Sequence, residues 1–452
     1  MYRLSDIEQQ YKNKLVSLDE AAGKVKDGDR IYFGIGTGVA KDLDAALAKR
    51  VGGLNDLEII SLITFPDGPF KTFEASKDNP TIRFASTHFN GYDRQMNTEG
   101  KCWYIPIQFR ELPRYWYEEG NAIDVVMIQV APMDKFGNFN LGPQIADIHG
   151  VIANAKTVIV EVNENMPIAH GIQTELNISQ VDYITEGSNA PINELLSKAP
   201  TEIDKLTAKH VVEKIKNGST LQLGIGGLPT CIGTMLCDSD VKDLSCHTEM
   251  LVDSYYDLYE AGKITGNKNV LKGKMVYTFA GGNRKLYDMI DNNPILCGAP
   301  VNFVNDISVV AQMDNFVSVN SCLQVDLFGQ VASETIGARH FSGTGGQLDF
   351  VLGAYLSKGG QSFICLPSAR KLRDGRIVST ISATMEPGTI ITTPRMATHH
   401  IVTEYGAVNL KGKSTRERAE LLISIAHPDF REALIADAEK LGIWKNTSKC
   451  TW

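Results

Sequence analysis

The chain of 452 residues lacks the apolar segments that mark membrane and secreted proteins. It has no run of 18 apolar residues, so we expect no membrane-spanning helix. Its first residues, MYRLSDIEQQYKNK, contain no apolar core of a signal peptide, so we expect no secretory signal. Basic residues are outnumbered, 45 against 53 acidic ones, and the pI is about 5.7. This balance argues against nucleic acid as the main partner, but it does not exclude a local basic pocket.

Cysteines with metal or redox spacing are also absent. None of the eight cysteines forms C-x-x-C, and no Cys/His spacing matches a zinc site, so we expect no metal. Scattered cysteines in a long acidic chain predict reduced thiols, mostly in the core, of a cytoplasmic protein. The cysteines are Cys102, Cys231, Cys237, Cys246, Cys297, Cys322, Cys365 and Cys450.

Three glycine-rich turns are present, but none has a nucleotide-binding pattern. They are 34–38 (GIGTG), 224–229 (GIGGLP) and 342–350 (SGTGGQLDF). The dinucleotide fingerprint G-x-G-x-x-G fails in each, and neither a Walker A motif nor a G-x-S-x-G serine-hydrolase motif occurs. Glycine loops at strand ends can direct N–H groups at an anion or an oxyanion. A tight strand–helix turn is the simpler interpretation of a single such loop, but three loops in one chain, two of them similar in sequence, weaken that interpretation.

Internal similarity organises the chain into two halves. Gly28–Gly36 (GDRIYFGIG) resembles Gly218–Gly226 (GSTLQLGIG), and Asp134–Asn138 (DKFGN) resembles Asp326–Gln330 (DLFGQ) at nearly the same separation. A third pair of Thr-Glu dipeptides, after VDYI and after HHIV, lies further apart and requires an insertion in the second half. So long a period indicates two tandem homologous domains rather than a solenoid. A composition of 43% apolar and 22% charged residues is ordinary for soluble globular domains.

Short apolar runs alternate with helical patterns within each half. We expect buried strands at 124–131, 157–162, 316–320 and 362–366, helices at 18–26 and 208–217, and a final helix pair broken at His427-Pro428. Such alternation predicts α/β domains with mainly parallel sheets. We place the two domains at 1–203 and 204–452, joined near 187–206.

One carboxylate stands in an apolar context, in the segment Cys246–Asp253 (CHTEMLVD). Partial desolvation would raise the pKa of Glu249 and make its carboxylate more nucleophilic. From the pattern alone, a buried structural glutamate is the simpler interpretation. His247 beside it is expected to be packed and hydrogen-bonded rather than catalytic.

The order of the motifs GIGGLP, HTEM, NSCLQVD and SGTGGQLDF resembles a known family over essentially the whole chain. The resemblance continues through TEYGAVNLKGKS and ISIAHPDF. It is to the class I coenzyme A transferases of the acetyl-CoA hydrolase/transferase group, and most of all to butyryl-CoA:acetate and 4-hydroxybutyryl-CoA CoA-transferases. Two similar α/β domains are typical of this family.

The resemblance implies one active site per chain, with roles for individual residues. By this resemblance, Glu249 would be the nucleophile that carries CoA as a glutamyl thioester. The first half has no matching HTEM glutamate, so one active site per chain is expected. The residues implied to line the CoA thioester are Gly224, Ile225, Gly226, Gly227, Leu228, Asn320, Leu323, Gly345, Gly346 and Gln347. No cofactor would be bound permanently, since CoA is the substrate and covalent intermediate. The first domain would cover the site and shape the acyl pocket.

The leading hypothesis is therefore transfer of CoA between a short-chain acyl-CoA, preferably butyryl-CoA, and acetate. The alternatives are a 4-hydroxybutyryl-CoA donor, an acetyl-CoA hydrolase, and a ligand-sensing domain of the same fold without catalysis. Acyl-CoA and a short-chain carboxylate are the expected partners, with no membrane or nucleic acid. We expect a homodimer or a dimer of dimers.

Two further stretches are candidates for substrate contacts. Residues 86–97 (STHFNGYDRQMN), rich in Asn and aromatic residues, are expected to influence acyl specificity. Arg370-Lys371-Leu372-Arg373 is the densest basic cluster of the second half and could bind CoA phosphates. A solvated loop is an equally good interpretation of that cluster.

Overall fold

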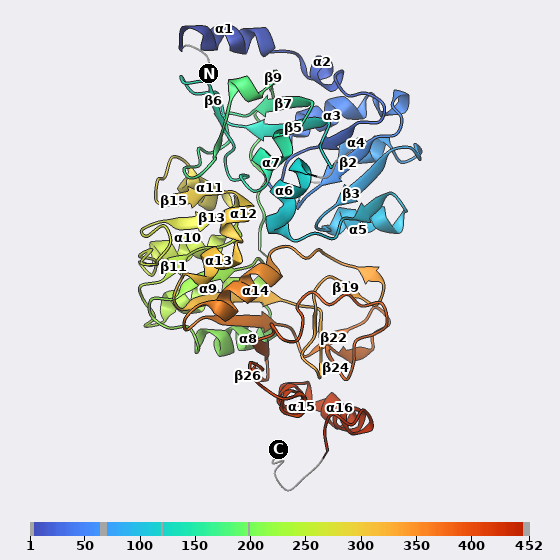
Figure 1. Ribbon diagram of the computed structural model, residues 1–452, viewed down its shortest axis with the longest axis vertical. Helices are drawn as coiled ribbons and strands as arrows, with labels where there is room; N and C mark the ends of the chain where they lie inside the picture. Colours follow the sequence, from blue (N-terminus) through green and yellow to red (C-terminus); the bar gives the residue numbers. More distant parts are fainter. Residues whose placement is uncertain (1–3, 64–69, 119–120, 198, 446–452) are drawn as a thin grey trace. The chain divides into compact units, whose positions relative to one another are not determined.

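The computed structural model describes residues 4–63, 70–118, 121–197 and 199–445 (Figure 1). Contacts within the chain define two compact units. The first contains Met1–Leu196, Glu249–Asp253 and Lys274–Asn305, and the second contains Ser197–Thr248, Ser254–Gly273 and Asp306–Trp452. Every helix among the described residues is too short or too polar to cross a bilayer.

A seven-stranded parallel sheet forms the centre of the first unit, in the order β4-β3-β2-β1-β5-β7-β9. Strand β5 is buried along its whole length, which explains why its sequence VVMIQV is nearly all apolar instead of alternating. The strands are β1 (Arg30–Tyr32), β2 (Glu58–Ser61), β3 (Arg83–Ser86), β4 (Cys102–Tyr104), β5 (Val125–Val130), β7 (Thr157–Val162) and β9 (Tyr183–Glu186).

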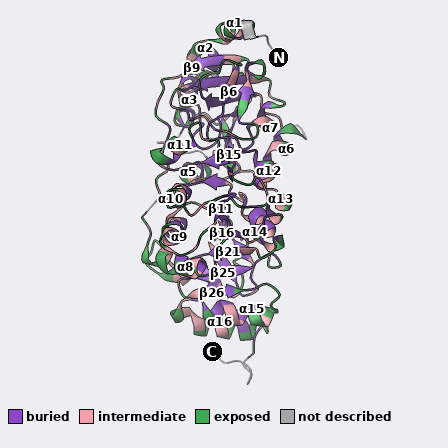
Figure 2. Ribbon diagram, turned by 90° about the vertical axis from the view of Figure 1, so that its left-hand side faces the viewer, coloured by how far each residue is buried: buried purple, intermediate pink, exposed green. Residues whose placement is uncertain are grey.

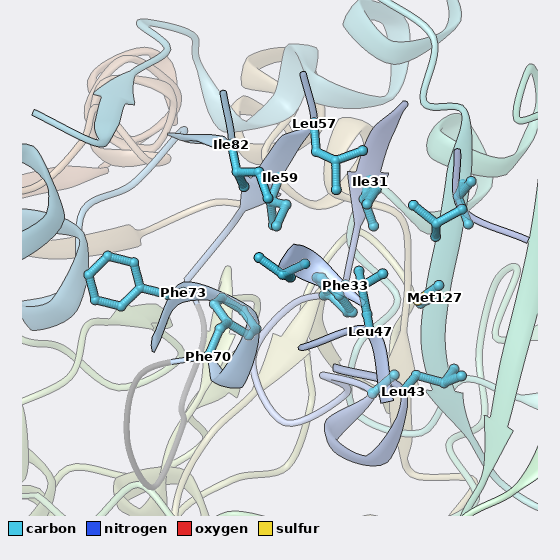
Figure 3. Close-up of a cluster of buried hydrophobic side chains, with 14 of the residues drawn as sticks. Ile31, Phe33, Leu43, Leu47, Leu57, Ile59, Phe70, Phe73, Ile82 and Met127 are labelled. Carbon is cyan, nitrogen blue, oxygen red and sulfur yellow. The ribbon is translucent and has the colours of Figure 1, made fainter. Parts of the chain in front are cut away.

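Side chains from this sheet meet those of α3 and α4 in a hydrophobic core (Figure 3). The rings of Phe33 and Phe70 stack with their centroids 5.5 Å apart, and Phe73 packs edge-on against Phe84. The helices are α1 (Leu4–Lys14), α2 (Leu18–Ala22), α3 (Lys41–Ala48), α4 (Lys71–Ala75), α5 (Gly91–Thr98), α6 (Leu112–Tyr117) and α7 (Ile148–Ile152), with 3-10 turns η1 (Val51–Gly53), η2 (Phe109–Glu111) and η3 (Ile178–Gln180).

Two stretches from the middle of the chain complete the first unit through backbone hydrogen bonds. The N–H of Ala280 donates to the carbonyl of Pro143 at 2.9 Å, and the N–H of Ala146 donates to the carbonyl of Thr278 at 3.0 Å. The added elements are β12 (Met250–Leu251), β13 (Met275–Tyr277), β14 (Phe279–Ala280), β15 (Leu296–Gly298), α11 (Arg284–Ile290) and α12 (Val301–Val304), beside the β6 (Asn138–Asn140)–β8 (Glu175–Asn177) pair. Part of the predicted segment 204–452 therefore packs with the first unit, although the predicted boundary lies close to Leu196. The roles assigned to the two segments stay predictions.

The second unit is built around a six-stranded sheet in the order β11-β10-β16-β21-β25-β26. All neighbours are parallel except β25 and β26, and most of β16 and β21 is coloured as buried in Figure 2. The sheet strands are β10 (Thr220–Leu223), β11 (Ser245–Cys246), β16 (Phe316–Ser321), β21 (Gln361–Cys365), β25 (His400–Thr403) and β26 (Gly406–Asn409). The helices are α8 (Glu202–Val212), α9 (Gly227–Asp238), α10 (Asp253–Glu260), α13 (Ile307–Ala311), α14 (Gln347–Leu356), α15 (Thr415–Ser424) and α16 (Pro428–Lys440).

The two units repeat one another, as the sequence predicted. The order β2-β1-β5-β7-β9 has its counterpart in β11-β10-β16-β21-β25. The shared turn is equally clear: the Asp134 carboxylate accepts the N–H groups of Phe136 and Asn138, and the Asp326 carboxylate accepts those of Phe328 and Gln330. The turn glycines, Gly137 and Gly329, both have φ of 84°. The predicted fold class, α/β with mainly parallel sheets, is confirmed.

The predicted insertion in the second unit occurs on both sides of β21. Residues 333–346 and 366–399 are longer than the corresponding stretches of the first unit, 141–147 and 163–182. They contain two antiparallel hairpins, β19 (Thr335–Ile336)–β20 (Arg339–His340) and β22 (Ala369–Lys371)–β23 (Ile377–Ser379). Beside them lies a small sheet of β17 (Gln324–Asp326), β18 (Val331–Ala332) and β24 (Ile381–Ser382).

The predicted elements agree with the structure except at helix ends. The four predicted strands are β5, β7, β16 and β21, and the final helix pair breaks at His427-Pro428 as predicted. The helix predicted at 18–26 is α2 and ends at Ala22, because Gly23 follows. The one predicted at 208–217 is α8, which begins at Glu202 because Thr201 forms a capping box with Asp204. Seven cysteines are free thiols, and Cys450 lies outside the described residues.

Candidate active site

Glu249 is the half-exposed residue between two buried ones, Thr248 and Met250. Its Oε2 accepts a hydrogen bond of 2.6 Å from the side-chain amide of Asn305. Its backbone carbonyl accepts the N–H groups of Thr278 at 3.0 Å and Phe279 at 3.2 Å, as β12 pairs with β14. The glutamate is thus held by its main chain and one carboxylate oxygen, and the side chain keeps access to solvent.

Asn305, which the sequence analysis missed, is completely buried at the C-cap of the short helix α12. Its Oδ1 has no hydrogen-bond partner among the described residues. A buried amide with one unused acceptor is costly unless its position serves another group. Asn305 lies 56 residues from Glu249 along the chain, so no local motif could reveal the pair.

The strand beside Glu249 is supported by the first half of the chain. Gln144 forms a bridge with Phe279, so β14 lies between β12 and the segment around Gln144. The aromatic ring of Phe109 packs edge-on against Phe279 at 5.8 Å. Within the first unit, the candidate nucleophile therefore stands on a scaffold built from both halves of the sequence.

The loop Gly224–Leu228 connects β10 to α9 in the second unit. Gly226 has φ of 119°, which disfavours any side chain, and a Cβ on Gly227 would lie 2.7 Å from Oδ2 of Asp204. A Cβ on Gly224 would approach nothing closer than 3.9 Å. Backbone strain and packing thus explain the second and third glycines but not the first. Ile225 is 43% exposed and Leu228 is buried.

The hydroxyl of Tyr255 stabilises the end of β10, just before this loop. Pairing between β10 and β11 stops at Cys246, and beyond it Tyr255 Oη accepts the N–H of Leu223 at 2.9 Å and donates to the carbonyl of Leu221 at 3.0 Å. Tyr255 is fully buried. Its hydroxyl therefore takes the place of the missing strand at the point where the glycine loop begins.

Asn320 and the loop Gly345–Gln347 belong to the same edge of the second sheet. Asn320, near the carboxyl end of β16, donates from Nδ2 to Gln222 Oε1 at 3.2 Å. Gly346 caps α14, which returns to the start of β21, so the N-termini of α9 and α14 both lie at the carboxyl edge. Gly345 has φ of 53°, and Gln347 Nε2 donates to Thr393 Oγ1 at 3.2 Å. Leu323 lies beyond β16, where its N–H donates to the carbonyl of Ala332 at 2.9 Å.

The first N–H groups of a helix have no acceptor inside the helix, and together they favour a negative charge. Neither Gly226 nor Gly346 provides a side-chain cap. The carboxyl edge of the second sheet thus presents two helix N-termini suited to an anion or a developing oxyanion.

In the two other stretches predicted to contact substrate, 86–97 and 370–373, the observed contacts stabilise the fold. Within 86–97, the buried Asp93 carboxylate accepts hydrogen bonds from Ser61, Ser86 and Asn90, and burial raises its pKa. This network caps α5. Arg370 is half-buried in the β22–β23 hairpin. Among the described residues, no cluster of His, Cys, Asp and Glu has a metal-binding arrangement.

Two family models together match most of the chain. Residues 2–194 match the Acetyl-CoA hydrolase/transferase N-terminal domain, and residues 282–438 match the Acetyl-CoA hydrolase/transferase C-terminal domain. The chain belongs to the acetyl-CoA hydrolase/transferase family. The predicted resemblance is thereby confirmed.

Similar proteins cover nearly the whole chain. The butyryl-CoA:acetate CoA-transferase of Anaerostipes caccae is 46% identical over 98% of this chain and 99% of its own. The 4-hydroxybutyrate coenzyme A transferase of Clostridium kluyveri is 39% identical over 96% and 99%. The crystal structure of RipA from Yersinia pestis superposes with a TM-score of 0.87 at 35% identity, covering 97% of this chain and 100% of RipA. The chain is an enzyme of the CoA-transferase class.

Proposed function

We propose that this enzyme moves CoA between a short-chain acyl-CoA, with butyryl-CoA as the favoured donor, and acetate. The reaction passes through a glutamyl-CoA thioester on Glu249. The observation that carries this proposal is the 2.6 Å hydrogen bond from the buried Asn305 amide to Glu249 Oε2. The 46% identical butyryl-CoA:acetate CoA-transferase supports the choice of donor.

In the first half-reaction, the Glu249 carboxylate attacks the butyryl thioester carbonyl, and the C–S bond breaks. This gives a mixed anhydride and CoA thiolate. The thiolate attacks the glutamyl carbonyl, the anhydride C–O bond breaks, and butyrate leaves. The glutamyl-CoA thioester retains the energy of the original thioester.

Acetate then reverses the sequence. It attacks the glutamyl carbonyl and expels CoA thiolate, which attacks the acetyl carbonyl of the new anhydride to give acetyl-CoA and free Glu249. No net proton transfer is needed, so a carboxylate without an adjacent general base suffices.

Each tetrahedral intermediate places negative charge on an oxygen. We assign the donors for this charge to Asn305 and to the N–H groups of the loops Gly224–Leu228 and Gly345–Gln347. An oxyanion donor of this kind contributes about 3 kcal/mol to lowering the barrier. Asn320 and Leu323 would contact the pantetheine end of CoA, and the Arg370–Arg373 hairpin would meet its phosphates.

Incubation of butyryl-CoA with labelled acetate tests the proposal. The expected products are labelled acetyl-CoA and butyrate, and initial-rate plots should be parallel because butyrate leaves before acetate enters. Free CoA without acetyl-CoA would identify a hydrolase, and no turnover would favour a ligand-sensing protein. Intersecting lines would indicate a ternary complex and exclude a covalent CoA carrier.

A second donor, 4-hydroxybutyryl-CoA, is favoured by the 39% identical transferase and by the 4-hydroxybutyrate CoA-transferase structure of Porphyromonas gingivalis, which has a TM-score of 0.79 at 29% identity. The same assay with both donors in competition ranks them by kcat/KM. A higher value for 4-hydroxybutyryl-CoA would overturn the preference for butyryl-CoA.

We also propose a homodimer or a dimer of dimers, on the basis of the family resemblance and the prevalence of two-fold symmetry. Light scattering on the intact chain tests this. A fully active monomer of 49.6 kDa would contradict it.

A further inference from the structure

Glu334 is a buried carboxylate that the proposed chemistry does not use. It lies between β18 and β19 with only 4% of its surface exposed. Its Oε2 accepts the hydroxyl of Thr344 at 3.1 Å, and its Oε1 accepts the hydroxyl of Thr392 at 2.9 Å. Both donors are themselves shielded, since Thr392 is buried and Thr344 half-buried.

The backbone of Glu334 holds the same loop. Its carbonyl accepts the N–H of Phe341 at 2.7 Å and that of Ser342 at 3.4 Å. One residue therefore binds the main chain at the start of the loop and a side chain just before Gly345. The loop between these anchors is Gly-rich and would otherwise have wide backbone freedom.

The segment on the other side of Glu334 is fixed as well. Thr392 Oγ1 accepts the N–H of Ser333 at 3.0 Å, and the neighbouring Thr393 receives the side-chain amide of Gln347. Glu334 thus links residues 341–344 to Thr392, and the adjacent Thr393 binds Gln347 at the other end of the loop. A second anchor, Gln347, lies at the first residue of α14.

Burial of a carboxyl group is costly unless its oxygens are hydrogen-bonded, and here each oxygen accepts a threonine hydroxyl. A well-packed apolar residue would fill the space at lower cost. A carboxylate at this position is therefore better explained by geometry, because its two oxygens fix two hydroxyls at a defined separation.

We propose that Glu334 is a positioning residue for CoA transfer, which holds Thr344 so that the N–H groups of Gly345 and Gly346 are aligned with the thioester carbonyl. This inference rests on the proposed function. Displacement of a catalytic group by about 1 Å can cost about 100-fold in rate. Loosening the loop is therefore expected to lower kcat while the substrate-binding surface remains.

The first test compares Glu334→Gln with a matched control, Asp44→Asn. Asp44 is also a buried carboxylate that accepts a threonine hydroxyl, from Thr72, but it lies in α3 of the first unit. We expect both variants to lose some thermal stability. Glu334→Gln should reduce kcat about 10- to 100-fold with little change in KM for butyryl-CoA, whereas Asp44→Asn should keep the parental kcat.

The second test uses the hydroxyl partner. Thr344→Val should reproduce the kcat loss of Glu334→Gln, Thr344→Ser should restore most of the rate, and the double variant Glu334→Gln/Thr344→Val should be no slower than either single variant. Equal kcat in wild type and Glu334→Gln, or additive losses in the double variant, would overturn the proposal.

Hydrogen exchange of residues 341–347 separates this inference from the proposed function. In the absence of substrate, exchange there should be faster in Glu334→Gln than in wild type, while exchange in α9 should be unchanged. A wild type that transfers no CoA would overturn the proposed function, and unchanged exchange at 341–347 would by itself overturn the positioning role of Glu334.

Discussion

The two glycine loops, Gly34–Gly38 and Gly224–Leu228, follow equivalent strands but lead to different helix N-termini. In the first unit, α3 begins at Lys41, and the N–H groups of Asp42 and Leu43 donate to Glu161 Oε2 at 3.0 and 2.8 Å. In the second unit, α9 begins at Gly227 with no side-chain cap. The N-terminus of α3 is capped by a side chain of the same unit, whereas that of α9 has no side-chain cap, although the Asp204 carboxylate lies beside Gly227.

Strand register identifies the residue responsible. Gln129 of β5 pairs with Glu161 of β7. The pairing of β1 with β5 and of β10 with β16 makes Ser321 the counterpart of Gln129, and Ser321 pairs with Cys365 of β21. An internal carboxylate in the first copy is thus replaced by an apolar residue in the second. The difference teaches that one fold can satisfy a helix N-terminus with its own side chain or reserve it for a bound anion.

The insertions reinforce this contrast. The loop Gly345–Gln347 lies at the end of one insertion, and the Arg370–Arg373 hairpin lies in the other. The pairing of β1 with β2 corresponds to that of β10 with β11, so Glu58 is equivalent to Ser245. Counting on from these residues, Leu62 of the first copy takes the position of Glu249. The features assigned to catalysis are thus those in which the second copy differs from the first.

The largest expected effect is a loss of transfer activity that distinguishes Glu249 from Glu161, the buried glutamate of the first unit. Glu249→Gln should remain folded and lose transfer activity by several orders of magnitude, because an amide cannot form the anhydride. Glu161→Gln should lose stability and keep its activity per folded molecule. Borohydride reduction of enzyme treated with acyl-CoA, followed by peptide mapping, checks the first part. A label on any residue other than Glu249 would refute the assignment.

A strong effect is also expected at the two glycine caps. Gly346 has φ of −99°, which any residue can adopt, so Gly346→Val should lower kcat/KM strongly with little loss of melting temperature. Gly226 has φ of 119°, so Gly226→Val should lower both. Rates normalised to folded protein distinguish the two. If Gly346→Val loses activity only in proportion to unfolding, the loop is a structural turn.

A smaller effect compares two fully buried tyrosines. Tyr255→Phe leaves the N–H of Leu223 without its acceptor, which should cost about 1–3 kcal/mol of unfolding free energy and slow transfer by displacing the adjoining loop. The hydroxyl of Tyr277 has no partner among the described residues, so Tyr277→Phe should be neutral or stabilising. Urea unfolding of both variants, with kcat, provides the test. Equal behaviour would show that the Tyr255 hydroxyl is dispensable.

The smallest expected effect is the pH dependence of the free energy of unfolding contributed by each unit. Burial raises the pKa of Glu161 from 4.5 to about 7, so its protonation stabilises the fold fully below pH 4.5 and less as pH rises to 7. Within that window, this contribution to the free energy of unfolding falls by at most about 1.4 kcal/mol per pH unit. The difference between wild type and Glu161→Gln, measured by urea unfolding from pH 4 to 8, isolates it.

Two histidines of the second unit should change the stability with pH in the opposite direction. Burial lowers the pKa of His399 from 6.5 to about 3 and that of His400 to about 4. Below pH 6.5 the unfolded chain binds these protons first, so stability falls as pH decreases. His400→Gln should weaken this acid-side loss. A variant whose stability follows the wild-type curve at every pH would contradict the assignment.

Much of the architecture could be predicted from local sequence. The buried strands β5, β7, β16 and β21 are recognisable as continuous apolar runs, because both faces of a parallel sheet are covered. The repeated DKFGN and DLFGQ turns could be found because each is stabilised by an Asp that bonds residues within four positions. The extent of α8 was missed, because its start depends on a capping box at Thr201.

The candidate site also has features that the sequence predicts and features that only the tertiary structure reveals. By itself, the sequence determined the α/β class, the tandem repeat, the glycine loops and the unusual context of Glu249, since each depends on neighbouring residues. Only the tertiary structure decided that Asn305 binds Glu249, that Tyr255 completes the edge of β10, that Glu161 occupies one helix N-terminus and that Glu334 anchors the other loop. These partners come from separate segments, and a hydrogen bond depends on distance in space, which spacing along the chain does not encode until the sheets bring the segments together.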